Sequence, residues 1–215
     1  MARKMIVQRE DESTPAMLTE MLAEGEAQLQ EIVKDNPDLL PVDEFGMAGP
    51  LMVVGRETTL SSGYVDLACL SQSGELLLVE FKTGSQNSDF RHALAQLLDY
   101  GSDIWRMTYE EFENTVASRF FSSVHCRDDR LRGKTSLDEA ILAIWSDLIQ
   151  EGTSFQERLT EKLTSGAFHY VIVAQHFTPT MERTVDYLNS LASHARFYAV
   201  EIVRFATNGI SAFES

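Results

Sequence analysis

Apolar residues recur at helical spacing near the start of the chain. Thr14-Pro15 has the form of an N-cap followed by proline in the first turn, and apolar side chains then follow every three or four residues. They are Met17, Leu18, Met21, Leu22, Leu29, Ile32 and Val33. Asn36-Pro37 disfavours further helix, because the residue before a proline avoids the helical region. The pattern therefore predicts one helix from about residue 14 to residue 36.

Three apolar runs with strand character follow, each bounded by Gly, Ser or Pro. They span residues 51–58, 63–70 and 75–82. An antiparallel meander is the simplest pairing for three strands with such short connections. A helix is predicted next over residues 89–100, because Ala93, Leu94, Leu97 and Leu98 form an apolar stripe there.

The character of the chain changes between residues 103 and 165. Three capping-box patterns open amphipathic segments in this stretch: Thr108-x-x-Glu111, Ser136-x-x-Glu139 and Thr153-x-x-Gln156. Such segments predict a helical lobe laid against the sheet. The pattern then returns to a strand over 168–177, a helix opened by Thr178-Pro179 and a strand over 197–205.

This order of elements predicts one α/β domain over residues 1–215, with a mixed central sheet and an inserted helical lobe at about 103–165. The composition agrees, because 215 residues with 44% hydrophobic and 24% charged side chains suit one globular domain. No apolar run approaches the roughly 20 residues that a membrane span needs, and the N-terminal apolar stretch is too short for a signal peptide. We therefore expect a cytoplasmic protein that makes no membrane contact.

The charge balance restricts how the chain can bind nucleic acid. Its formal net charge of -15 excludes a non-specific polyanion binder held by bulk charge, so any such contact must be local. The densest basic run, residues 127–134, contains Arg127, Arg130, Arg132 and Lys134. It is interpreted either as a solvated loop or as a rim that binds nucleic acid. Cys69 and Cys126 lack metal-binding spacing and are expected to be buried or inert thiols.

Acidic and basic residues interrupt two of the predicted strands. Glu80 and Lys82 share one face of their strand because strand side chains alternate, and Asp66 stands alone in the preceding strand. A five-residue connection over 71–75 would set Asp66 opposite Glu80 and Tyr64 opposite Lys82. Two neighbouring carboxylates repel each other, which raises their pKa values or recruits a divalent cation. An exposed ion cluster at the sheet edge is the alternative interpretation.

Two helices carry further polar candidates. Glu26 lies between Leu22 and Leu29 in the apolar stripe of the first helix, whereas Glu20, Glu24 and Glu31 fit a solvated face more easily. In the helix after the meander, one side carries a polar row at a spacing of four residues. The row consists of His92, Gln96 and Tyr100. A hydrogen-bonding row at this position could face the carboxylates.

The combination of Asp66, a 13-residue gap, Glu80-Phe81-Lys82 and Gln96-x-x-x-Tyr100 resembles the PD-(D/E)xK nuclease superfamily. It is most similar to the RecB-like branch, which carries a QxxxY motif after the metal-binding strand. Val65, not proline, precedes the acid, as is common in that branch. The resemblance covers residues 20–105 and, less closely, 168–205, and it implies a restriction-endonuclease-like core of helix, three strands, helix and strand.

The resemblance also implies a chemistry and roles for the candidate residues. Asp66, Glu80 and the backbone carbonyl of Phe81 would bind Mg²⁺, for which Mn²⁺ could substitute, and Glu26 would bind a second ion or its water. Lys82 would orient the nucleophilic water or stabilise charge on the phosphate, and Gln96 and Tyr100 would position ions or substrate. The implied function is hydrolysis of phosphodiester bonds, with DNA the expected substrate.

Several alternatives stay open at this stage. DNA and RNA, single and double strands, and internal and terminal cleavage are all compatible with these motifs. Nucleic acid could contact Tyr100, His92 and the basic run at 127–134, and a partner protein or further domain could supply targeting. A homodimer is also left open. The other functional class is a catalytically silent module of the same fold that binds nucleic acid or protein.

Overall fold

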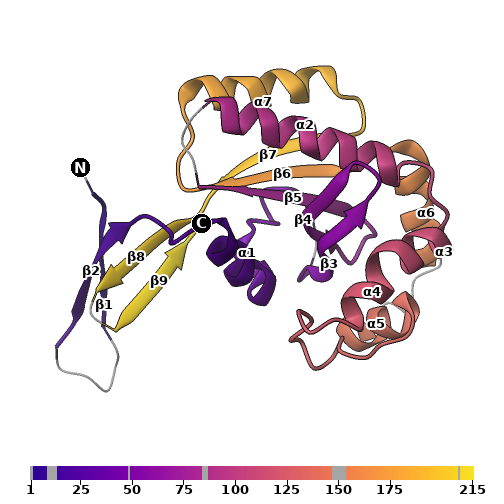
Figure 1. Ribbon diagram of the computed structural model, residues 1–215, viewed down its shortest axis with the longest axis horizontal. Helices are drawn as coiled ribbons and strands as arrows, with labels where there is room; N and C mark the ends of the chain where they lie inside the picture. Colours follow the sequence, from indigo (N-terminus) through magenta and orange to yellow (C-terminus); the bar gives the residue numbers. More distant parts are fainter. Residues whose placement is uncertain (1, 9–13, 48, 84–86, 147–153, 208) are drawn as a thin grey trace.

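The computed structural model describes residues 2–8, 14–47, 49–83, 87–146, 154–207 and 209–215 (Figure 1). The elements in chain order are β1 (Lys4–Val7), β2 (Ala16–Met21), α1 (Glu26–Asp35), η1 (Pro37–Leu39), β3 (Met52–Leu60), β4 (Gly63–Leu70), β5 (Leu76–Lys82), α2 (Asn87–Ile104), α3 (Tyr109–Phe112), η2 (Glu113–Ala117), α4 (Ser118–Phe121), α5 (Leu137–Ile144), α6 (Phe155–Ser165), β6 (His169–Ala174), α7 (Pro179–Leu191), β7 (Arg196–Glu201), β8 (Val203–Thr207) and β9 (Ile210–Glu214).

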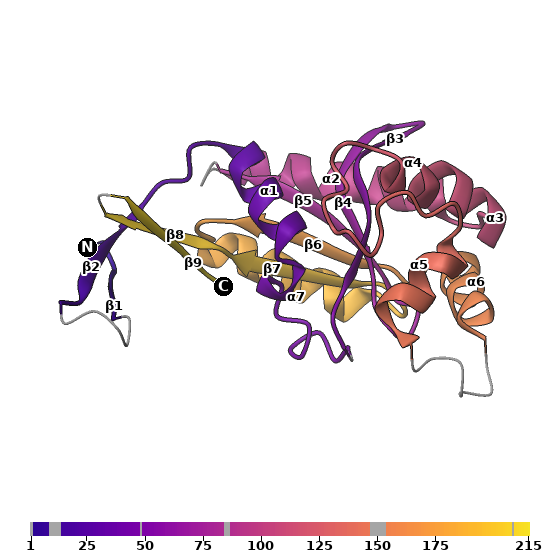
Figure 2. The same ribbon diagram turned by 90° about the horizontal axis from the view of Figure 1, so that it is seen from below.

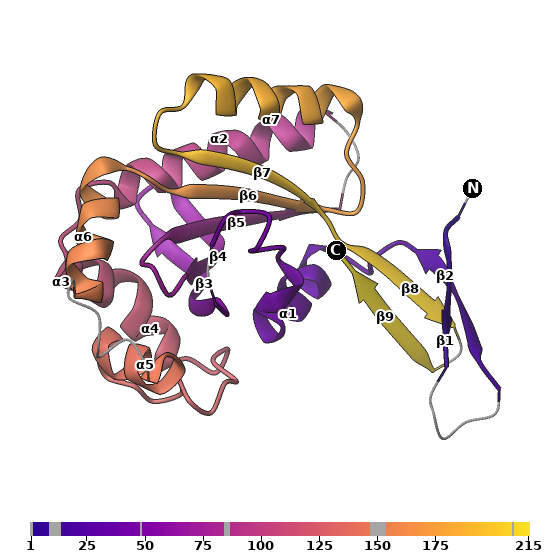
Figure 3. The same cartoon turned by 180° about the vertical axis from the view of Figure 1, so that it is seen from behind.

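The centre of the molecule is a mixed five-stranded sheet in the order β3-β4-β5-β6-β7. β3, β4 and β5 form the predicted antiparallel meander, and β6 and β7 add parallel to β5. Helices α2 and α7 cover one face of the sheet and α1 lies on the other (Figures 1 and 3). β5 is buried over Leu76–Phe81, as expected for a central strand covered on both faces. The predicted restriction-endonuclease-like core is therefore confirmed.

The helical lobe lies beside β3 and β4, at one end of the sheet, and contains η2 and helices α3 to α6 (Figure 2). Thr108 and Glu111 form the predicted capping box, and Ser136 caps α5 by accepting from the Glu139 N–H. The cap of α6 is Ser154 with Glu157, one residue beyond the predicted pair. Thr153 itself lies outside the described residues. Neighbouring Thr and Ser both suit an N-cap, so the pattern left the choice of residue open.

The predicted helix over residues 14–36 is wrong in its first half. Ala16–Met21 forms strand β2, and α1 begins only at Glu26. β2 pairs with β1 through Met5↔Leu18 and Val7↔Ala16, and with β8 through Thr19↔Ala206. Met17, Leu18 and Met21 fit helical spacing, but pairing with two other strands decides the conformation, because tertiary contacts override weak local preference.

The predicted strand over 197–205 is divided between two sheets. Ile202 separates β7, in the central sheet, from β8, which joins a second sheet in the order β1-β2-β8-β9. The Ile202 N–H donates to the Ala174 carbonyl at 2.8 Å and so closes the ladder of the central sheet. A continuous apolar run fits either arrangement, so the pattern alone could not locate this break.

The four-stranded sheet has a small core of its own and projects from the end of the molecule opposite the helical lobe (Figure 2). Leu18, Val203 and Phe205 are buried there, apart from the main core. The sequence did not predict this sheet, and the assignment of residues 1–215 to a single domain stays a prediction. Among the described residues, no helix is both long and apolar enough to cross a membrane. Cys69 and Cys126 are buried free thiols, as predicted.

Candidate active site

The candidate site lies where β4 and β5 stop pairing. The predicted register is confirmed, since Leu67↔Val79 and Leu70↔Leu76 are partners, and one further step along both strands sets Asp66 against Glu80. Beyond Leu67 the Phe81 N–H donates to Asp66 Oδ2 at 2.9 Å. A side-chain carboxylate thus takes the place of a backbone acceptor at the end of the ladder. The Phe81 carbonyl faces the same side, because N–H and C=O of one strand residue point together.

Glu80 is the most unusual group of the site. Its side chain is 2% exposed, and one carboxylate oxygen, Oε1, accepts from Lys82 Nζ at 2.8 Å. The other oxygen, Oε2, is buried and has no hydrogen-bond partner among the described residues. Burial first, and then the charge of Asp66, raise the pKa of Glu80 to about 7. Burial also raises the pKa of Asp66, against the opposing effect of the Phe81 N–H.

Lys82 connects the strand carboxylates to the start of α1. Its Nζ lies 3.9 Å from Glu26 Oε2, and Glu26 Oε1 accepts from the Thr83 N–H at 3.4 Å. Burial by itself lowers the pKa of Lys82, but the ion pair with Glu80 and the charges of Glu26 and Asp66 raise it overall. The structure therefore brings together Glu26, Asp66, Glu80 and Lys82, and their roles stay predictions.

Two of the three predicted polar residues of α2 also reach this site. Gln96 Nε2 donates to the Tyr100 hydroxyl at 3.2 Å, and the Tyr100 ring lies against Gly63 at the start of β4. Burial, followed by the charge of Glu80, raises the pKa of Tyr100. Gln96 Oε1 is buried without a hydrogen-bond partner in the described part of the chain. His92 lies one turn earlier on α2 and is exposed.

Sequence reasoning missed Gln30 as a member of the site. It lies one turn after Glu26 on α1, is 7% exposed, and hydrogen-bonds to Asp66, which partly opposes the rise that burial causes in the pKa of that carboxyl. The available signal was a glutamine between Leu29 and Val33 at a spacing of four from Glu26. A polar residue inside an apolar stripe indicates a specific partner, because burying an unpaired amide is costly.

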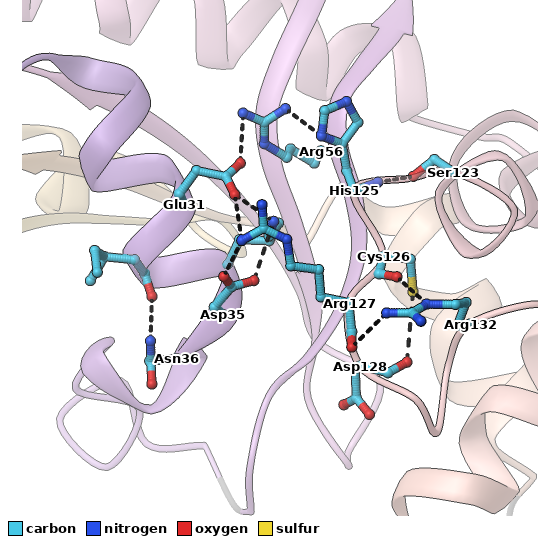
Figure 4. Close-up of polar contacts among 12 residues, drawn as sticks. Glu31, Asp35, Asn36, Arg56, Ser123, His125, Cys126, Arg127, Asp128 and Arg132 are labelled. Carbon is cyan, nitrogen blue, oxygen red and sulfur yellow. Dashed lines mark hydrogen bonds and ion pairs between the residues drawn. The ribbon is translucent and has the colours of Figure 1, made fainter.

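The basic run at residues 127–134, which we call the basic segment, contacts the far half of α1 (Figure 4). Arg127 Nη1 lies 3.0 Å from Asp35 Oδ2 and 3.4 Å from Glu31 Oε2. Arg130 pairs with Asp128 of its own segment at 2.7 Å. The charges of Arg127 and Arg130 are therefore already matched by carboxylates, and of these only Asp35 and Glu31 on α1 lie outside the segment.

Arg132 also pairs with a carboxylate of the segment, because its Nη1 lies 3.3 Å from Asp129 Oδ1. Arg132 Nε donates to the Cys126 carbonyl at 2.9 Å and Arg132 Nη2 donates to the Arg127 carbonyl at 3.1 Å (Figure 4), so this side chain holds the shape of the segment. Lys134 is half-buried. A cleft of about 710 Å³ is lined both by the end of α1 and by the basic segment. Its lining carries both signs of charge, including Lys34, Asp35 and Arg127, so it is not a uniformly positive groove.

The donor set of the site suits a hard divalent cation, although it is small. Mg²⁺ prefers oxygen ligands, and Asp66, Glu80 and the Phe81 carbonyl offer such oxygens at the end of one ladder. The unpartnered Glu80 Oε2 is a buried acceptor that a cation would satisfy. Within the described residues, no three His, Cys, Asp or Glu side chains form a metal-binding group. Lys82 lies between Glu80 and Glu26, which keeps the third acid apart.

Three solved structures match this chain, each at low sequence identity. EndoMS in complex with double-stranded DNA matches with 14% identity over 93% of this chain and a TM-score of 0.42. EndoMS in its apo form matches with 13% identity over 93% and a TM-score of 0.38, and a repair endonuclease from Pyrococcus abyssi with 10% identity over 92% and a TM-score of 0.37. This chain spans 65% of the length of each. No protein-family model and no curated protein matches it.

Proposed function

We propose that this chain is a divalent-metal-dependent nuclease that hydrolyses phosphodiester bonds, with DNA as its substrate. One observation carries the proposal: a buried glutamate, Glu80, has one oxygen paired with Lys82 and the other without a partner among the described residues, directly beside Asp66. Buried carboxylates are normally fully hydrogen-bonded, and groups with strongly raised pKa values cluster at functional sites. An exposed ion cluster, the alternative interpretation, does not account for a glutamate that is 2% exposed.

Mg²⁺ is the proposed cofactor and Mn²⁺ its expected substitute. Asp66, Glu80 and the Phe81 carbonyl would hold the ion, with Glu26 as the acid for a second one. When bound, the ion supplies charge stabilisation at the scissile phosphate and a more acidic water at neutral pH. It also removes the repulsion between the two carboxylates, because their negative charges then face a common cation.

Lys82 has a distinct role in this proposal. Its ammonium is held at the mouth of the site by Glu80 and Glu26, with a pKa raised so that it stays charged at neutral pH. A fixed cation at this position can stabilise negative charge that develops on the phosphate or orient the attacking water. Tyr100, held by Gln96, would orient the substrate backbone through its hydroxyl. The QxxxY motif and the RecB-like branch stay predictions.

Nucleic acid must bind this acidic protein through local contacts. The proposed contacts are Tyr100, His92 and the four cations of the basic segment. Because Arg127 and Arg130 already pair with Asp35 and Asp128, they would exchange a carboxylate for a phosphate on binding. Such an exchange gains less affinity than a free cation would, so we expect weak intrinsic binding and a contribution from a partner protein or a further domain.

A substrate panel tests the proposal. Purified protein with Mg²⁺ or Mn²⁺ is incubated with linear, circular, single-stranded and double-stranded DNA and with RNA, and each reaction is repeated in EDTA. We expect cleavage of at least one DNA substrate that depends on the metal. Absence of cleavage throughout the panel, or equal cleavage in EDTA, would contradict the proposal.

A second candidate function is a catalytically silent module of the same fold. The observation that favours it is that no three acidic or histidine side chains form a metal-binding group within the described residues. Calorimetric titration with Mn²⁺ separates the two candidates, because a silent module has no need of a divalent ion. Saturable binding that Glu80→Gln removes supports the nuclease, and no binding supports the silent module.

A further inference from the structure

The connection between the two sheets leads directly into the proposed site. The chain leaves β2 at Met21 and enters α1 at Glu26, so residues 22–25 pass from the four-stranded sheet to the central one (Figures 1 and 3). Glu26 is the first residue of α1. Gly25, its N-cap, makes no side-chain hydrogen bond to the first turn. Within the first turn, Gln28 Oε1 accepts from the Glu24 N–H at 3.0 Å, and the other side-chain contacts to this connection come from outside the helix.

Gln175 holds this connection from the side of the central sheet. It directly follows β6, next to Ala174, which pairs with Lys82 of β5. Its side chain is 3% exposed and makes two hydrogen bonds to the connection. Oε1 accepts from the Ala23 N–H at 2.8 Å, and Nε2 donates to the Met21 carbonyl at 3.1 Å. The buried amide is therefore satisfied by the backbone on both sides of Leu22.

Arg204 of β8 holds the same connection from the other sheet. Its Nη1 donates to the Leu22 carbonyl at 3.4 Å, and its Nη2 pairs with Glu24 at 3.0 Å. Gln175 and Arg204 together contact the backbone of Met21, Leu22 and Ala23 and the side chain of Glu24. The position of the connection depends on both sheets.

The short length of chain between Ala23 and Glu26 limits how far Glu26 can move while Gln175 is hydrogen-bonded to Met21 and Ala23. Only Glu24 and Gly25 separate Ala23 from Glu26, and an extended chain covers at most about 3.6 Å per residue. Leu29 and Val33 are buried and hold the middle of α1 against the core, but no apolar side chain of residues 26–28 is buried. The contacts of Glu26 with Thr83 and Lys82 are long, 3.4 and 3.9 Å, and cannot hold the turn alone.

We infer that Gln175 is a positioning residue, which sets the place of Glu26 beside Lys82 by fixing the backbone at Met21 and Ala23. The inference rests on the proposed function, in which Glu26 faces the metal. Gln175 takes no part in the chemistry itself. The inference also gives the four-stranded sheet a role, because Arg204 of that sheet contacts the same connection.

The test compares Gln175→Met with a matched control, Asn189→Leu. Asn189 makes the same reciprocal pair with the backbone, accepting from the Phe197 N–H at 2.9 Å and donating to the Phe197 carbonyl at 2.8 Å, but it lies on α7. Mn²⁺ affinity is measured by calorimetry and folding by thermal melts, with each variant also made in a Glu26→Gln background. Arg204→Met is a second variant that weakens the same connection and leaves Gln175 in place.

We expect Gln175→Met to weaken Mn²⁺ binding roughly 10-fold, in the range found for groups that orient metal ligands, and Asn189→Leu to leave it unchanged. Arg204→Met should weaken it in the same direction. In the Glu26→Gln background the effect of Gln175→Met should disappear, which a general loss of stability would not produce. If wild type binds Mn²⁺ and the two amide variants behave alike, or the loss persists without Glu26, the inference is wrong. If wild type does not bind Mn²⁺, the proposed function fails with it.

Discussion

Replacing Glu80 by glutamine should stabilise the metal-free protein. The pKa of Glu80 rises from its ordinary 4.5 to about 7 in the folded state. Each pKa unit corresponds to about 1.36 kcal/mol, so ionising this buried group lowers the free energy of unfolding by about 3 kcal/mol. Glutamine stays neutral, has nearly the same volume and still offers an oxygen to Lys82. It therefore avoids this cost.

The sign of the pH dependence follows from which state binds the proton more tightly. Folded wild type keeps the Glu80 proton to higher pH than the unfolded chain, so its free energy of unfolding falls as the pH rises from about 4.5 to about 7. Below this window wild type and Glu80→Gln should be equally stable. At pH 8 in EDTA the variant should be more stable by about 3 kcal/mol, a rise in Tm of roughly 6 to 12 °C for a chain of this size.

The assay is a series of thermal and urea unfolding curves for both proteins between pH 4 and pH 8.5, in EDTA and with added Mg²⁺. Glu44→Gln, at an exposed glutamate, controls for the loss of one charge. Mg²⁺ at 100 times its Kd should raise the free energy of unfolding of wild type by about 2.7 kcal/mol. It should raise that of Glu80→Gln by less. The reasoning is refuted if Glu80→Gln is less stable than wild type at pH 8 in EDTA, or if the difference does not change with pH.

Three further outcomes follow from the structure. Asp66→Asn keeps an acceptor for the Phe81 N–H and removes a repulsive charge, so its Tm in EDTA should rise and its gain from Mg²⁺ should be smaller than that of wild type. Gly101→Ala should cost about 1–3 kcal/mol in urea unfolding, because its Cβ would overlap the Tyr170 hydroxyl, and Tyr170→Phe should recover part of that loss. Replacing the four cations of the basic segment by serine should make DNA binding less dependent on salt. The slope of log K against log salt concentration should become shallower by about 0.9 for each phosphate that is no longer neutralised. An unchanged slope would assign the segment a purely structural role.

The sequence predicted those parts of the molecule that local pattern determines. A five-residue connection and strict alternation along β4 and β5 predict the register that places Asp66 opposite Glu80. The structure confirms this register. The caps Thr108 and Ser136 were likewise predictable, because an N-cap bonds only within its own first turn.

The parts that the sequence did not predict depend on contacts between distant residues. Whether Ala16–Met21 is helix or strand is decided by β1 and β8, and the break at Ile202 by a carbonyl of β6. Gln175 contacts Ala23 across 152 residues, which no local pattern reveals. The pairing of Arg127 with Asp35 spans 92 residues, so the basic segment could only be interpreted from its own composition.

The role of Glu80 and Lys82 in hydrolysis is tested most directly by the initial rate of DNA cleavage in Mg²⁺. The rate is measured for wild type, Glu80→Gln, Lys82→Ala and the control Glu44→Gln, with circular dichroism to establish that each is folded. Glu80→Gln and Lys82→Ala should each lose at least about 100-fold in rate with unchanged spectra, while Glu44→Gln keeps the wild-type rate. Full activity in Glu80→Gln or Lys82→Ala would contradict the assignment of this site.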